Sequence, residues 1–484
     1  MDANVQFGLF HFPIHSLESF SWNMGCCIPA SLSGENDWFA SRQGHLKALS
    51  LVTDGTCYDE CQDFCGLFSL KHLRSFSWRG FDEKDRRIRA VLRQILRLNA
   101  GHLEVLELEP LSDDSLEDNL AITDVISLSE TNPYDELILF FKADASQRAC
   151  IPNMTAVVNF PSFRDLSLTR MSLDSSWRKL ATIICFEKLR SLAIRLCISD
   201  LLFLSELASS SQILNVRSFE IVEHGLLGPQ QWTQNKHPVA QFLEPFKGLE
   251  ELYISVPAND VLPFFQAIIE HRSTQKRLVL HTRLKYLKCC DLPLVSDGIL
   301  DCLGLSVPPY LLRRTLESDQ TLEKLRLIHV RICGGSYDTS RAFCREFATS
   351  DGSCTCTELD QKCPWDEVTC MHCLKNFADW AFGPTGLPNL LVIAFGDFSH
   401  DRRFSGSHMF IFRELTPSTK LLRFADRGIH DHLLDGIQGA QRMLGACPTQ
   451  PILKYFGSDF GDSDTEYLTD WSVEFEVSLD GDNE

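Results

Sequence analysis

Hydrophobic positions along this chain follow one pattern, Leu-x-x-Leu-x-Leu with close substitutes, which returns about every 30 residues. The last two positions of each copy alternate, so they point to one side of a strand while the residue between them points to the other side. A strand this short cannot bury its own apolar face, but copies stacked side by side would form a parallel sheet with a continuous core. The copies are Leu17/Phe20/Trp22, Leu46/Leu49/Leu51, Leu73/Phe76/Trp78, Leu103/Leu106/Leu108, Phe163/Leu166/Leu168, Leu189/Leu192/Ile194, Val216/Phe219/Ile221, Leu249/Leu252/Ile254, Leu284/Leu287/Cys289, Leu322/Leu325/Leu327 and Leu390/Ile393/Phe395, with weaker ones at Tyr134/Leu137/Leu139, Leu421/Phe424 and Leu453/Phe456.

Between the copies the spacing becomes helical. Residues 86 to 98, for example, place Ile88, Leu92 and Ile95 on one stripe. The pattern therefore predicts an α/β solenoid, with a parallel sheet on its concave face and helices on its convex face. The alternative is a set of unrelated strands in an ordinary α/β domain, but periods of 20 to 50 residues are typical of repeat architectures.

These repeats resemble the leucine-rich-repeat region of F-box/leucine-rich-repeat proteins, especially the irregular repeats of fungal members. The resemblance covers about residues 15 to 458 and implies a substrate receptor of a cullin-type ubiquitin ligase. Regular repeats carry Asn or Cys three residues after the last Leu, and here only Cys197 matches, which implies variable curvature. An F-box would precede Leu17. Either it lies upstream of Met1, or the protein does not contact the ligase adaptor.

Composition favours an intracellular interaction protein, cytoplasmic or nuclear. The net charge of -19 argues against nucleic-acid partners, whose phosphates the whole chain would repel. The sequence has neither a signal peptide nor an apolar run long enough to span a membrane. Nineteen Cys without a secretion signal are expected to be reduced thiols packed as small hydrophobic residues.

A cysteine-rich insertion at about 333–385 interrupts the period. Cys354 and Cys356, followed by Cys370 and Cys373, have the ligand number and approximate spacing of a structural zinc site. Helical packing competes with this reading, because both later cysteines share one face of a predicted helix at 366–382. Disulfide bonds are the third alternative. No other cofactor is expected.

The sequence lacks the G-x-S-x-G, P-loop, H-E-x-x-H and G-x-G-x-x-G motifs, so we expect no enzyme activity. The residues between the core leucines line the predicted concave face, where exposed Tyr flanked by opposite charges is typical of a protein interface. Solvated charges on a sheet face are the simpler interpretation. The predicted partner-binding residues are Glu220, Glu251, Tyr253, Tyr286, Lys288, Lys324 and Arg326.

We therefore predict a solenoid over 1–458 and an acidic tail at 459–484, which has no Lys or Arg and whose alternating apolar residues could add a capping strand. The predicted function is a non-enzymatic scaffold that binds a protein substrate or adaptor, most specifically within a ubiquitin ligase. One alternative is a leucine-rich-repeat adaptor or inhibitor unrelated to ubiquitin ligation. The other is a metal-dependent or different hydrolase.

Overall fold

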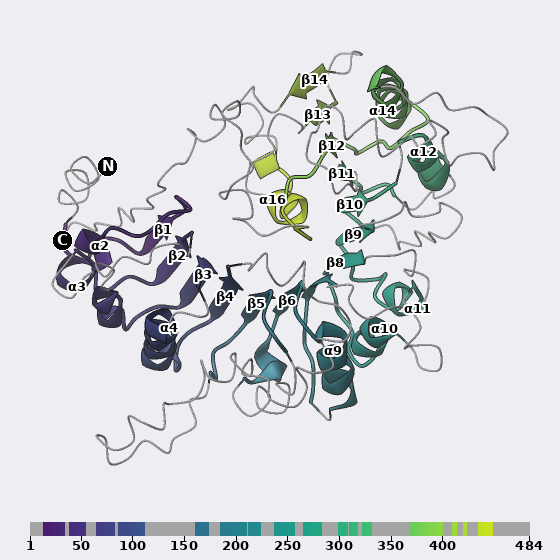
Figure 1. Cartoon of the computed structure of the whole chain (residues 1–484). Helices are drawn as coiled ribbons and strands as arrows, with labels where there is room; N and C mark the ends of the chain where they lie inside the picture. Colours follow the sequence, from purple (N-terminus) through teal and green to yellow (C-terminus); the bar gives the residue numbers. More distant parts are fainter. Residues whose placement is uncertain are drawn as a thin grey trace, which may run out of the picture. The chain divides into compact units, whose positions relative to one another are not determined.

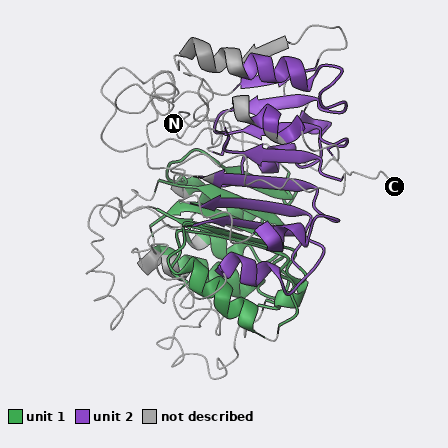
Figure 2. Cartoon of the chain, turned by 90° about the vertical axis from the view of Figure 1, so that its right-hand side faces the viewer, with its two compact units in different colours: residues 1–215, 450–484 green, residues 216–449 purple. Residues whose placement is uncertain are grey.

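The computed structural model divides the chain into two compact units, residues 1–215 with 450–484 and residues 216–449 (Figure 2). Among the residues described, no helix is long and apolar enough to cross a membrane. Both units are α/β, and their strands are mostly parallel. The structure describes residues 13–33, 38–54, 64–82, 86–111, 160–173, 184–210, 212–223, 237–256, 265–282, 299–307, 309–317, 322–331, 367–399, 409–413, 420–423 and 434–448.

Unit 1 contains a parallel sheet of strands in sequence order (Figure 1). Its register aligns the central apolar position of each copy, so that Leu49, Leu106 and Leu166 lie in one row with Phe20, Phe76 and Leu192. All six of these side chains are buried, which confirms the predicted pattern here. The strands are β1 (Ser19–Trp22), β2 (Ala48–Val52), β3 (Ser75–Phe81), β4 (Val105–Pro110), β5 (Asp165–Thr169) and β6 (Ser191–Arg195).

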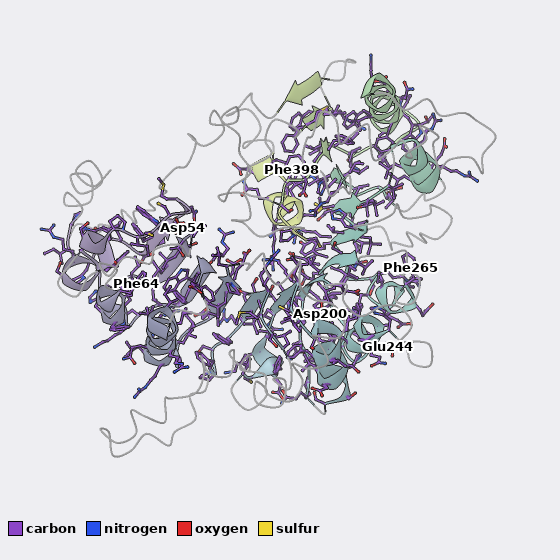
Figure 3. The ribbon with its side chains drawn as sticks, viewed as in Figure 1. Asp54, Phe64, Asp200, Glu244, Phe265 and Phe398 are labelled. Atoms are coloured by element: carbon purple, nitrogen blue, oxygen red, sulfur yellow. The ribbon has the colours of Figure 1, made fainter. Side chains whose placement is uncertain are left out.

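Short helical segments connect these strands and cover one face of the sheet (Figure 1). The α4 helix buries Ile88, Leu92 and Ile95, the stripe predicted from sequence. Phe64 lies on the same side of the sheet, with its ring 5.6 Å from that of Trp78 (Figure 3). The helical segments of unit 1 are α2 (Ala30–Ser33), α3 (Trp38–Arg42), η1 (Cys65–Ser69), α4 (Arg86–Asn99), η3 (Phe186–Lys188) and α9 (Asp200–Ser209).

Unit 2 begins with six parallel strands and ends with two antiparallel ones. The antiparallel end departs from the parallel order predicted for every copy. The strands are β7 (Ser218–Val222), β8 (Glu251–Val256), β9 (Arg277–Thr282), β10 (Cys302–Leu305), β11 (Leu327–Val330), β12 (Val392–Phe395), β13 (Met409–Phe412) and β14 (Lys420–Arg423). The helices are α10 (Pro238–Leu243), α11 (Phe265–Ile269), α12 (Pro309–Glu317), α14 (Glu367–Ala381) and α16 (Ala440–Leu444).

Three predicted copies, at Tyr134, Leu284 and Leu453, lie outside the described residues. The copy at Tyr134 falls between β4 and β5 in the sequence, and these two strands pair directly with each other. The copy at Leu284 lies outside the described residues, and both edges of β9 are occupied by β8 and β10. Instead, the chain forms β9 and β10, and Leu300-x-x-Leu303-x-Leu305 is a full copy of the motif that was missed.

The copy at Leu322 is correct in position but wrong in register. Ile328 pairs with Leu303 and Ile393, so the core row continues through Ile328 rather than through Leu325 or Leu327. Leu327 belongs instead to the row of Arg277 and Cys302, on the other face of the sheet. The adjacent apolar residues Leu325, Leu327 and Ile328 allowed either register, and strand pairing decided between them.

Amide side chains connect neighbouring repeats in unit 1. Asn99 Oδ1 accepts the backbone N–H of Leu73 at 2.9 Å, and its Nδ2 donates to Leu70 O at 2.8 Å. Gln43 holds the first repeat in the same way, accepting from Leu17 N at 3.1 Å. The buried Cys197 thiol lies 3.3 Å from Leu168 O on the neighbouring strand, as the side-chain ladder of regular repeats would place it. Burial raises the pKa of this thiol to about 12.

Candidate binding surface

We call the sheet face opposite the connecting helices the inner face. In unit 2 its side chains form three rows that alternate with the apolar core rows. All of them are buried, including charged ones. These rows contain Ser218, Glu251, Arg277, Cys302, Leu327 and Val392, then Glu220, Tyr253, Val279, Gly304, His329 and Ala394, and then Val222, Ser255, His281, Ser306, Arg331 and Gly396.

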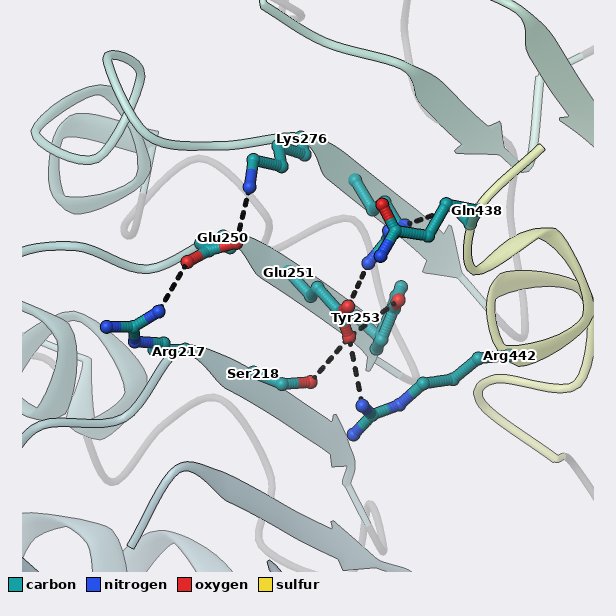
Figure 4. Close-up of polar contacts among 9 residues, drawn as sticks. Arg217, Ser218, Glu250, Glu251, Tyr253, Lys276, Gln438 and Arg442 are labelled. Atoms are coloured by element: carbon teal, nitrogen blue, oxygen red, sulfur yellow. Dashed lines mark hydrogen bonds and ion pairs between the residues drawn. The ribbon is translucent and has the colours of Figure 1, made fainter. Parts of the chain in front are cut away.

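Glu251 on β8 is the centre of the first buried polar cluster (Figure 4). Its Oε2 accepts hydrogen bonds from Ser218 Oγ at 2.9 Å and from Tyr253 Oη at 3.1 Å, while its Oε1 pairs with Arg277. Arg442 Nη1, on α16, lies 3.3 Å from the same carboxylate. Burial and the Glu251 charge raise the pKa of Tyr253 well above its ordinary value, so its phenol remains a hydrogen-bond donor.

Arg331, which follows β11, forms the second cluster. Its Nη1 donates to the carbonyl oxygens of Ala446 at 3.2 Å and Cys447 at 2.6 Å. Its Nη2 donates to Asp397 Oδ2 at 2.7 Å and to Ser399 Oγ at 3.0 Å. The guanidinium therefore neutralises one carboxylate and binds the carbonyls just after the C-terminus of α16, where a cation is favourable.

These contacts dock residues 434–447, which we call the covering segment, onto the inner face of unit 2. Arg277 Nε donates to Gln438 O at 3.1 Å, and Glu220 Oε1 accepts from Cys447 N at 2.7 Å. Apart from the Arg442 contact, these hydrogen bonds reach backbone atoms of the segment and come from charged side chains of the sheet. Charge-assisted hydrogen bonds of this kind make up for the cost of burying the charges.

Small residues make room for the segment. The α16 helix packs against β10, which presents Cys302 and Gly304 to the inner face. Gly439 precedes α16 with φ of 76°, and a Cβ atom there would lie 2.4 Å from Arg277 Cζ. Phe398 completes the cover, with its ring 5.5 Å from that of His329 (Figure 3). Burial also raises the pKa of Cys302 to about 12.

The structure changes the interpretation of the predicted partner-binding residues. Glu220, Glu251 and Tyr253 do lie on the inner face, but the expectation that Tyr253 is exposed is wrong, because it is 0% exposed. Lys324 and Arg326 precede β11 rather than lying within it, so they are not inner-face residues. The register error at Leu325 and Leu327 caused this misplacement. Tyr286 and Lys288 lie outside the described residues.

Sequence reasoning missed the covering segment, its anchors Arg277 and Arg331, and His281, which contacts Arg331. A signal was present, because the inner-face positions of β8, β9 and β11 carry ionisable residues where those of β1 to β3 carry mostly Ser and Ala. Opposite charges and a Tyr suggested an interface, and the chain's own segment occupies that surface.

The cysteine-rich insertion is described only in part. The α14 helix forms within the predicted 366–382, and it buries Leu374, Phe377 and Ala381. Cys354, Cys356 and the side chains of Cys370 and Cys373 lie outside the description, as does the acidic tail, so zinc, packing and disulfides stay alternatives there. Elsewhere Cys302 and Cys447 are buried free thiols, whereas the expectation of a reduced thiol is wrong at Cys27, which forms a disulfide bond.

The inner face of unit 1 has a different character. Many of its positions carry small side chains that are half-buried, such as Ser21, Ser50 and Ser167. Charged side chains, including Arg79 and Asp165, lie in the same rows. A charged pair links two of its strands, because Glu107 Oε1 lies 3.5 Å from Arg195 Nη1, and Glu107 Oε2 accepts from Ser77 Oγ at 2.7 Å. This face is therefore a mixed surface of hydroxyl groups and charged side chains.

Comparisons with known proteins do not assign the chain to a family. No protein-family model matches the sequence. A search of curated proteins likewise finds no significant similarity.

Proposed function

We propose that this chain is a non-enzymatic, leucine-rich-repeat scaffold that binds a protein partner through the inner face of unit 1. The main observation that supports this proposal is the contrast between the inner faces of unit 1 and unit 2. The face of unit 2 buries its charges against the covering segment, whereas unit 1 presents half-buried hydroxyl and charged groups over six parallel strands. Solenoid proteins use extended sheet faces of this kind as binding surfaces.

The more specific proposal is a substrate-recognition subunit of a cullin-type ubiquitin ligase. It is supported by the resemblance of the Leu-x-x-Leu-x-Leu copies to F-box/leucine-rich-repeat proteins. Contact with the ligase adaptor would require an F-box ahead of the repeats. An adaptor or inhibitor with the same repeats but no ligase partner is the alternative.

The test is affinity purification of the tagged full-length chain from cells that express it naturally, followed by mass spectrometry. Ser50→Arg combined with Val105→Arg places two large cations on the inner face of unit 1, where both native side chains are half-buried. We expect this variant to lose the major partner. Leu202→Arg is the matched control, because Leu202 is 49% exposed on α9, away from the inner face.

The outcomes distinguish a ligase subunit from an adaptor or inhibitor. Recovery of a cullin adaptor with the native chain supports the ligase subunit, while recovery of one other stoichiometric partner supports the adaptor or inhibitor. Undiminished partner recovery by the double variant would exclude the inner face of unit 1 as the binding surface. Thermal unfolding of all variants establishes that any loss is not caused by misfolding.

A further inference from the structure

A charged residue directly precedes each of the six strands of unit 1, and these residues together form a row across the sheet. Backbone hydrogen bonds fix this row, because each carbonyl accepts two N–H groups of the next repeat. Lys47 O, for example, accepts from Arg74 N at 2.7 Å and from Ser75 N at 3.0 Å. The same pattern joins the other members, so the row consists of Glu18, Lys47, Arg74, Glu104, Arg164 and Arg190.

A row of histidines runs beside it. His15, His45, His72 and His102 each lie one or two residues before the first Leu of a copy. The rings of His15 and His45 stack with centroids 4.2 Å apart, and His45 and His72 meet edge to face at 5.4 Å. The contacts show that side chains from successive repeats gather at this edge of the sheet.

Together with Lys71, Glu187 and Lys188, these two rows form a surface that we call the basic edge. It carries six cations, Lys47, Lys71, Arg74, Arg164, Lys188 and Arg190, against the three carboxylates Glu18, Glu104 and Glu187. Glu104 pairs with both Arg74 and Arg164, whose side chains nevertheless remain 64% exposed. Within the described part of the chain, no carboxylate pairs with Lys71, Lys188 or Arg190.

The local excess of positive charge is opposite in sign to the net charge of -19. At physiological ionic strength the Debye length is about 8 Å, so a short ligand at the basic edge is governed by the nearby cations. A long polyanion such as a nucleic acid would also meet the acidic remainder of the chain. Arg binds carboxylates through two parallel hydrogen bonds, and the ring N–H groups of His add further donors.

We propose that the basic edge of unit 1 binds an acidic, Asp- and Glu-rich segment of a partner protein. This proposal rests on the scaffold function, which it extends from the inner face to the start of the same strands. Neighbouring strands lie about 4.8 Å apart, so the edge presents its cations at regular intervals to a segment that crosses the strands. Such a contact would set the orientation of the partner and speed its association.

A short fluorescein-labelled peptide of alternating Glu and Gly, titrated with the full-length chain, tests the proposal by fluorescence anisotropy. We expect binding that weakens as NaCl is added. Arg74→Glu combined with Arg164→Glu should reduce the affinity by about tenfold or more, because two attractive contacts become repulsive. Arg314→Glu is the matched control, because Arg314 is an exposed residue of α12 in unit 2. This variant should bind the peptide with an affinity within about twofold of that of the native chain.

A milder variant keeps the test valid if Arg74→Glu with Arg164→Glu does not fold. Lys71→Gln with Arg190→Gln removes two exposed cations that have no carboxylate partner among the described residues. It should weaken peptide binding without changing thermal unfolding. Equal binding by native and variant chains, or no binding by the native chain, would overturn the proposal.

Two further results distinguish this proposal from the scaffold function. An oligonucleotide of equal charge that binds more tightly than the peptide would identify a nucleic-acid surface and overturn the acidic-segment proposal. If Ser50→Arg with Val105→Arg loses the partner while the native chain ignores the peptide, the scaffold stands and the basic edge fails. If the peptide binds as expected but partner recovery survives the inner-face variant, the basic edge stands and the inner-face site fails.

Discussion

Arg331 shows how single residues organise the inner face of unit 2. Its side chain is 1% exposed, and its donors reach one carboxylate, one hydroxyl, one imidazole and two backbone carbonyls. Each of those partners is partly or wholly buried and would lose its donor if the guanidinium were removed. Removing one member of a buried ionic network lowers the free energy of unfolding strongly, because the remaining charges stay buried without a partner. Replacing the whole network with apolar residues has a much smaller effect.

We expect Arg331→Leu to lower the free energy of unfolding by about 3–5 kcal/mol, because it leaves Asp397 and the carbonyls of Ala446 and Cys447 without their cation. Arg74→Leu removes a cation from the exposed pair with Glu104 and should cost about 0–1 kcal/mol. Urea unfolding followed by circular dichroism measures both. Equal losses would show that Arg331 does not hold the covering segment.

At the scale of the element, α16 depends on its surroundings. It is only one to two turns long, and isolated helices shorter than about 12 residues are marginal in water. Its position is set by the anchors at Gln438, Arg442 and Cys447, and by burial of Met443 and Leu444. Gly439 permits the sharp approach, because its left-handed backbone and missing side chain leave space for the Arg277 guanidinium.

Gly439→Ala should therefore loosen the covering segment. The new Cβ would collide with Arg277 Cζ and strain the positive φ, so the Arg277 contacts with Glu251 and Gln438 should weaken. Hydrogen exchange of residues 434–447 should become at least about tenfold faster, which corresponds to a decrease of about 1.4 kcal/mol in the free energy of local opening. Gly445→Ala is the control, because its Cβ would make ordinary contact at 3.4 Å and its φ of -77° is unstrained. Unchanged exchange in Gly439→Ala would contradict this account of the segment.

For the whole molecule, buried histidines couple stability to pH. Burial, with Arg331 nearby, lowers the pKa of His281 well below 6.5, and burial also lowers that of His271. At a pH above the ordinary histidine pKa, both side chains are neutral in the folded and in the unfolded state. Below it the unfolded chain takes up protons that the folded chain refuses, so stability decreases as the pH falls.

We expect the free energy of unfolding to decline between about pH 6.5 and 5, above the range in which carboxylates titrate. His281→Asn removes one of these groups while offering an oxygen to Arg331, and it should flatten the profile. His271→Asn should flatten it further. Denaturant unfolding at a series of pH values provides the measurement, and an unaltered slope in both variants would show that other groups cause the dependence.

The sequence by itself determined the repeating strand and helix pattern, because an apolar row needs only local alternation to be recognised. Leu106, Leu166 and Leu252 are buried in the rows that their spacing predicts. The α4 and α14 helices follow from their apolar stripes in the same way. Where apolar residues adjoin, as at Leu325 to Ile328, the local pattern fits two registers and cannot choose.

Only the tertiary structure decided what covers each face. Glu251 and Tyr253 have the alternation of solvated positions, yet they are buried by a segment that lies far along the chain. Arg277 and Gln438 are 161 residues apart, and no periodicity relates them. The basic edge was also hidden, because its cations are scattered in sequence and gather only when parallel strands bring equivalent positions of successive repeats together. Local patterns specify elements, whereas long-range contacts specify which surfaces remain open to a partner.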